Sequence, residues 1–129
     1  MPKSPSWILT IDSQFSASHS LRNYGGKCEA LHGHNFGVSI RVRGSKLDPK
    51  TEILVDFTDL KRELATVLKL LDHKHLNEAE PFTAINPSSE NLSRFIYQKM
   101  EQALEPYGVR MVSATVTEKP GQSATYTEE

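Results

Sequence analysis

The chain has 129 residues, the size of one ordinary domain and enough to bury a hydrophobic core. Its 15 Lys and Arg residues nearly balance 16 Asp and Glu residues, so the net charge of −1 gives no reason to expect a nucleic acid or an anionic membrane as partner. One cysteine excludes an internal disulfide, no apolar stretch approaches the ~20 residues that cross a bilayer, and the N-terminus lacks the apolar core of a signal peptide, so we expect one cytoplasmic domain over residues 1–129.

Two alternating runs predict a pair of strands in the first third of the chain. The first run, over residues 7–19, has one apolar face made of Trp7, Leu9, Ile11, Phe15, Ala17 and His19. The second, over residues 32–43, has a similar face made of His32, His34, Phe36, Val38, Ile40 and Val42. If the runs pair as an antiparallel hairpin through the loop of residues 20–31, the three imidazoles gather at the loop end of the apolar face.

These three histidines, His19, His32 and His34, suit a catalytic zinc ion. Zinc sites that carry out chemistry usually keep three protein ligands and leave a fourth position for water or substrate, whereas structural sites use four. A His-x-His pair alone is as often two polar residues at the end of a sheet. The third histidine on the same face favours the metal site.

The only cysteine, Cys28, lies in the predicted loop four residues before His32, next to Lys27. A thiol beside a cation readily forms the thiolate, which then acts as a base or nucleophile near neutral pH. The alternative is an inert, buried cysteine. Its position beside the histidines favours a catalytic role.

Two helices are predicted in the middle of the chain by apolar residues spaced three and four apart. A short extended run over residues 53–57 leads into the first helix, for which Thr58 is a plausible N-cap. The second helix follows Pro87, with Ser88 or Ser89 as its N-cap, and ends at Pro106 and Gly108. The apolar positions are Phe57, Leu60, Leu64, Val67, Leu68 and Leu71 in the first helix, and Leu92, Phe95, Ile96, Met100, Ala103 and Leu104 in the second.

A carboxylate and an imidazole are adjacent at Asp72 and His73, at the predicted C-terminal end of the first helix. A carboxylate that orients an imidazole is a common way to build a general acid or base. The alternative is a helix end whose basic residues complement the helix dipole, and His75 fits that alternative better.

Residues 109–118 and 123–127 read as two final strands joined by a turn at Pro120 and Gly121. Alternation places Glu118 on the same face as Val112, Ala114 and Val116, where an unpaired carboxylate is unfavourable unless a ligand with N–H donors binds it. The complete order is ββααββ, with room for one extra short strand. It predicts an α+β domain in which two helices cover one face of an antiparallel four-stranded sheet.

The assembled pattern resembles the 6-pyruvoyltetrahydropterin synthase and 6-carboxytetrahydropterin synthase family over nearly the whole chain. The resemblance rests on short motifs in a fixed order, namely Phe15-Ser16-Ala17-Ser18-His19, Cys28-x3-His32-Gly33-His34, Val55-Asp56-Phe57, Leu71-Asp72-His73, Asn86-Pro87-Ser88-Ser89-Glu90 and Thr117-Glu118. It implies the tunnelling fold, in which such sheets join into a barrel, and a homohexamer of two trimers with sites between subunits.

The resemblance also implies roles for the site residues. Zinc would be held by His19, His32 and His34, with Cys28 as catalytic base and the Asp72–His73 pair as its proton-transfer partner. Glu118 would anchor a pterin ring through its N–H groups. Ser88 and Ser89 fall where the family contacts the ring, often with threonine.

The substrate implied by the resemblance is 7,8-dihydroneopterin triphosphate, but three products remain open. The short chain and its compact segment from Lys27 to His34 favour the bacterial 6-carboxytetrahydropterin synthases of the queuosine and 7-deazaguanine pathway, which release acetaldehyde and triphosphate. The 6-pyruvoyl product is an alternative. Because some relatives use a glutamate before His-Gly-His, Glu29 suggests a third route, cleavage to 6-hydroxymethyl-7,8-dihydropterin for folate synthesis.

The sequence also offers a second class of function and several cations for the triphosphate. A zinc- and pterin-binding protein without turnover is the hypothesis from another class, although the complete set of acid–base residues argues against it. The triphosphate has four candidate cations, which are Arg22, Lys27, Lys74 and Lys119.

Overall fold

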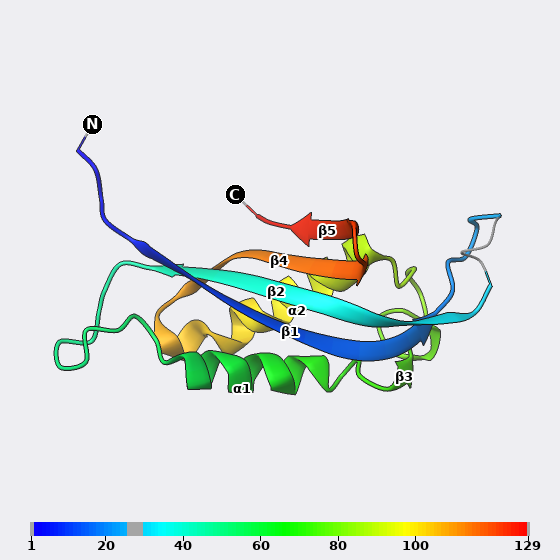
Figure 1. The fold of residues 1–129 in the computed structure, drawn as a ribbon, viewed down its shortest axis with the longest axis horizontal. Coiled ribbons are helices and arrows are strands. Elements are labelled where there is room, and N and C mark those ends of the chain that lie inside the picture. Colours follow the sequence, from blue (N-terminus) through cyan, green and yellow to red (C-terminus); the bar gives the residue numbers. More distant parts are fainter. Residues whose placement is uncertain (1, 26–29, 129) are drawn as a thin grey trace.

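The computed structural model describes residues 2–25 and 30–128, and in these ranges two α-helices cover one face of a five-stranded sheet (Figure 1). The order of strands across the sheet is β3-β1-β2-β4-β5, with β3 parallel to β1 and the other neighbours antiparallel. The α+β class is thereby confirmed. The elements in chain order are β1 (Trp7–His19), β2 (His32–Gly44), α1 (Phe57–Leu68), β3 (Lys74–His75), the 3-10 turn η2 (Leu76–Glu78), α2 (Ser89–Ala103), the 3-10 turn η3 (Glu105–Tyr107), β4 (Arg110–Lys119) and β5 (Gln122–Tyr126).

The extra strand is not where the sequence suggested it. Residues 53–56 form no strand, because the preceding segment folds on Asp48, whose backbone N–H donates to the Ile53 carbonyl at 2.9 Å and whose side chain accepts from the N–H of Lys50 at 2.8 Å. The fifth strand is the two-residue β3, which extends the sheet beyond β1. The sheet therefore has five strands and not the predicted four.

One of the two predicted helix N-caps is confirmed. Ser88 caps α2, accepting from the N–H of Asn91 at 3.2 Å, as predicted. Asp56 caps α1, accepting from the N–H of Thr58 at 2.8 Å, so the choice of Thr58 is wrong by two residues. Within the described ranges, neither α-helix is both long and apolar enough to cross a membrane.

A bulge in β4 changes which of its side chains reach the core. Arg41 pairs with Ser113 and Val42 with Met111, so Val112 is the extra residue. Met111 is buried and Val112 only half-buried. The prediction that Val112 shares the inner face is therefore wrong, whereas Ala114 and Val116, beyond the bulge, are fully buried.

The long hairpin of β1 and β2 has the register that the alternation predicts. Phe15 lies opposite Phe36, Ala17 opposite His34 and His19 opposite His32. Phe15 and Phe36 stack with ring centroids 4.9 Å apart, and the Phe36 ring also meets the rings of His19 and His34 at 5.2 and 5.5 Å. The buried apolar face between sheet and helices thus continues directly into the three histidines.

Replacing Phe36 tests this connection. We expect Phe36→Ala to lower the free energy of unfolding by about 3–5 kcal/mol, because it removes a fully buried ring and leaves a cavity beneath the histidines. Urea denaturation of the metal-free protein measures the change. The control Phe57→Ala, at a side chain that is 50 % exposed, should cost no more than about 1 kcal/mol. Equal losses in the two variants would contradict the assigned core.

Candidate metal centre

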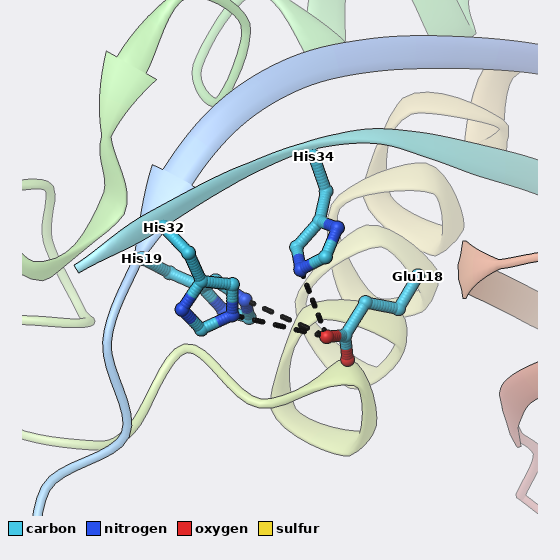
Figure 2. Close-up of side chains that lie close together, drawn as sticks. All are labelled: His19, His32, His34 and Glu118. Atoms are coloured by element: carbon cyan, nitrogen blue, oxygen red, sulfur yellow. Dashed lines mark ion pairs between the residues drawn. The ribbon is translucent and has the colours of Figure 1, made fainter. Parts of the chain in front are cut away.

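Three imidazoles and one carboxylate meet at the loop end of the β1–β2 hairpin (Figure 2). His19 ends β1, His32 and His34 begin β2, and Glu118 reaches in from β4. One ligand atom from each residue lies within 4.8 Å of all the others. Because His19 and His32 are direct partners in the ladder and His34 follows on the same face, the strand register itself produces the cluster.

The Nδ1 atoms of two of the imidazoles form hydrogen bonds with backbone carbonyls. His19 Nδ1 lies 2.8 Å from the Pro87 carbonyl oxygen, and His32 Nδ1 lies 2.7 Å from that of Ala30. A carbonyl oxygen only accepts, so in both cases Nδ1–H donates. In the neutral rings Nε2 then carries a lone pair, which is the arrangement that metal-binding histidines adopt.

The cluster is buried on one side and open on the other. His19 is 1 % exposed, and this burial lowers its pKa below the ordinary value. The hydrogen bond to the Pro87 carbonyl and the Glu118 carboxylate oppose the shift, and the imidazoles of His32 and His34 add to it. The side chains of His32 and His34 are 28 % and 21 % exposed. The cluster therefore contains one buried imidazole and two that are partly open to solvent.

Two buried nitrogens in the cluster have no hydrogen-bond partner among the residues that the structure describes. They are Nε2 of His19 and Nε2 of His34. Glu118 Oε1 lies 3.0 Å from His34 Nε2 without a hydrogen bond between them. Buried unsatisfied nitrogens are costly, and a divalent cation bound to their lone pairs removes the cost. The donor set thus fits a metal ion such as zinc.

Glu118 lies at a second irregularity of β4. Thr117 pairs with Ser123 and Lys119 with Gln122, so the ladder with β5 shifts around Glu118. The Glu118 carboxylate points at the cluster. Its Oε1 lies 3.0, 3.9 and 4.0 Å from Nε2 of His34, His32 and His19. It shares the inner face with Ala114 and Val116, as alternation predicts.

Two asparagines hold the chain that follows β1 against the segment before α2. Asn77 accepts from the N–H of Ser20 and donates to its carbonyl, at 2.9 and 3.0 Å. Asn86 binds the N–H and carbonyl of Arg22 in the same way, at 2.9 and 3.0 Å. Each side-chain amide thus replaces the backbone of a neighbouring strand. The pair, which we call the asparagine clamp, fixes the backbone next to Pro87, the partner of His19.

Arg22 strengthens the same junction. Its guanidinium donates to three backbone carbonyls, those of Phe82 at 2.8 Å, Ile85 at 3.1 Å and Asn77 at 3.3 Å. These bonds occupy the guanidinium of Arg22, which is one of the four candidate cations for binding the triphosphate. Lys74 and Lys119 are exposed, and Lys27 lies outside the described residues.

The Asp72–His73 pair is present but lies apart from the cluster. His73 Nδ1 is 2.9 Å from Asp72 Oδ2, and α1 has already ended at Leu68, so the pair occupies a turn. The N–H of Ser16 donates to the Asp72 carboxylate at 2.9 Å, and this bond, followed by that to His73, holds the Asp72 pKa below its usual value. The His73 side chain is 81 % exposed. It lines an open cavity of about 510 Å³ with Ser16, Ser18 and Lys74, and His34 of the cluster lines the same cavity.

The remaining predicted residues flank the cluster or are not described. Ser88 and Ser89 directly follow Pro87, and both are half-buried. Ser88 uses its oxygen to cap α2. Cys28 and Glu29 lie outside the described residues.

Comparison with known proteins gives a consistent match. The model of the family described as 6-pyruvoyl tetrahydropterin synthase matches residues 8–129. A 6-pyruvoyl tetrahydrobiopterin synthase of Poecilia reticulata is 36% identical over 120 residues, covering 80% of this chain and 81% of that protein. A putative 6-carboxy-5,6,7,8-tetrahydropterin synthase of Archaeoglobus fulgidus is 35% identical over 105 residues, covering 81% and 85%. The solved 6-pyruvoyl tetrahydropterin synthase of Caenorhabditis elegans superposes with a TM-score of 0.86 at 27% identity over 100% of both chains.

The asparagine clamp generates a prediction about metal binding. Asn86→Ala frees the backbone that holds the Pro87 carbonyl on His19, so we expect zinc affinity to fall about 10- to 100-fold, as for other losses around a metal ligand. Competition with a chromophoric chelator measures the affinity. Gln102→Ala, on the far part of α2, is the control and should not change it. Unchanged affinity in Asn86→Ala would show that the clamp stabilises the fold without positioning His19.

Proposed function

Because the chain belongs to the 6-pyruvoyl tetrahydropterin synthase family, we propose that it is a zinc-dependent lyase acting on 7,8-dihydroneopterin triphosphate. The product that we propose is 6-carboxy-5,6,7,8-tetrahydropterin, with release of acetaldehyde and triphosphate. The observation that carries the proposal is the convergence of three imidazoles, of which His19 and His34 have buried Nε2 atoms without a hydrogen-bond partner among the described residues. Such a set leaves a position for the substrate.

Zinc bound there would act as a Lewis acid on the hydroxyls of the substrate side chain and make their protons, and the adjacent C–H proton, easier to remove. Cys28 would accept one of these protons as the base. The Asp72–His73 pair would transfer a second of these protons. Asp72 would orient the ring of His73 through the contact at 2.9 Å.

The pterin ring would lie between Glu118 and the start of α2. A carboxylate without a partner lysine or arginine among the described residues suits the N–H groups of a pterin. Ser88 and Ser89 begin α2 close to Pro87 and so close to His19, which favours contacts from their hydroxyl or N–H groups to the ring. These roles extend the family resemblance to this chain residue by residue.

The exposed Asp72–His73 pair supports an assembly with sites between subunits. With a His73 side chain that is 81 % exposed and outside the histidine cluster, the pair is available to the site of a neighbouring copy. We therefore propose the homohexamer of two trimers that the family resemblance implies. A cytoplasmic location remains a prediction from the sequence.

Three products follow from different features of the chain and its relatives. The segment from Lys27 to His34 and the short chain favour the 6-carboxy product of the queuosine pathway. The 6-pyruvoyl product is favoured by relatives such as the Poecilia reticulata protein. Because Glu29 lies next to Cys28, cleavage to 6-hydroxymethyl-7,8-dihydropterin is the third product for which the experiment tests.

Product analysis by mass spectrometry tests the proposal directly. Zinc-loaded wild-type protein should convert 7,8-dihydroneopterin triphosphate to 6-carboxytetrahydropterin, and Cys28→Ala should lower kcat by about 10²–10⁴, the range for loss of a general base. Glu29→Ala is the matched variant and should leave the rate within about twofold. Ser20→Ala, in the same loop, controls for indirect effects.

Each alternative has its own signature in this experiment. A 6-pyruvoyl product would overturn the choice of product but keep the lyase. A 6-hydroxymethyl product lost in Glu29→Ala would assign the folate route. No consumption of substrate by the zinc-loaded protein would leave a pterin- and zinc-binding protein without turnover.

A further inference from the structure

We propose that Glu118 is an exchangeable fourth ligand of the metal ion, which it coordinates in the substrate-free protein and leaves for the N–H groups of the pterin ring. This inference rests on the proposed function, because it takes the ring as the competing partner. Besides anchoring the pterin, the Glu118 carboxylate would then have a second state, in which it occupies the fourth coordination position of the metal ion.

The distances around Glu118 place its oxygen near a coordination vertex. In a tetrahedral zinc site with bonds of ~2.0–2.1 Å, neighbouring ligand atoms are ~3.3–3.4 Å apart. Glu118 Oε1 lies 3.0, 3.9 and 4.0 Å from the three Nε2 atoms, on either side of that value. The oxygen thus approaches all three imidazoles at once, as the fourth vertex of one tetrahedron does. Figure 2 shows the carboxylate directed at the rings of His19, His32 and His34.

The surroundings of Glu118 allow it to move. Its side chain is 23 % exposed, and in the described part of the chain its ion-pair contacts are with the three imidazoles. The ladder between β4 and β5 shifts around Glu118, one residue before β4 ends at Lys119, so the side chain lies where regular pairing stops. Because no lysine or arginine in the described ranges holds the Glu118 carboxylate, it loses little when a new donor replaces its present contacts.

The exchange would connect recognition of the ring to exposure of the metal position. Three histidines and Glu118 together make a closed, four-ligand site, whereas coordination of the substrate hydroxyls needs an open one. A pterin ring that takes up the Glu118 carboxylate through two N–H donors opens the fourth position at the moment when the side chain arrives. A compound without the ring would meet a closed site.

Cobalt substitution tests the inference without turnover. Cobalt-loaded wild-type protein and Glu118→Gln should have different visible spectra, and Glu118→Gln should bind Co²⁺ at least about tenfold more weakly in a chelator competition, since a charged ligand is lost. Glu105→Gln, at an exposed glutamate in η3, is the matched control and should change neither. Metal-free thermal melts of each variant verify folding.

The second arm uses 7,8-dihydropterin, which has the ring but no side chain at C6. We expect it to change the spectrum of the cobalt-loaded wild type as Glu118 leaves, and to leave the spectrum of Glu118→Gln unchanged. Quenching of pterin fluorescence measures binding independently. Binding without a spectral change would overturn the exchange and keep the proposed function. Equal spectra and equal Co²⁺ affinities in wild type and Glu118→Gln would also overturn the exchange and keep the proposed function. Absence of pterin binding would overturn the exchange and the proposed function together.

Discussion

The antiparallel register of β1 and β2 is the constraint on which the candidate site depends. It sets His19 opposite His32 and Ala17 opposite His34, so that the pairing of the two strands brings the rings together. A slip of one residue would turn one strand's histidines to the outer face. The register is in turn fixed by the core, because the same slip would expose Phe15 or Phe36, which are both fully buried. Packing and metal geometry therefore impose the same alignment.

A second constraint acts from outside the hairpin. The asparagine clamp and the Arg22 guanidinium join the chain after β1 to the segment before α2, and this junction presents the Pro87 carbonyl to His19. Because that carbonyl fixes which nitrogen of His19 is protonated, the loop determines the chemical state of a residue that β1 positions. The serines at the start of α2 belong to the same segment. Metal ligand and predicted pterin contacts are thus held by one network.

Strand alternation in the sequence was sufficient to find the three histidines, since a period of two depends only on local geometry. Alternation was insufficient for β4, because the bulge at Val112 changes which side chains face the core, and the bulge is visible only in the pairing of β4 with β2. The helix cap at Asp56 was missed because Thr58 has an equally suitable side chain, and backbone geometry decides between them. Asn77 and Asn86 gave no signal, because a side chain that replaces a strand backbone is recognised only after distant segments have met. The Asp72–His73 pair was found from its chemistry, but its separation from the cluster depends on the turn after α1.

The central claim is that His19, His32 and His34 hold the metal ion through Nε2. X-ray absorption at the zinc edge of the zinc-loaded, substrate-free protein measures this most directly. The account predicts a first shell of three imidazole nitrogens and one oxygen at ~2.0–2.1 Å, and loss of one imidazole in His34→Ala. A sulfur scatterer at ~2.3 Å, or an unchanged shell in His34→Ala, would contradict it.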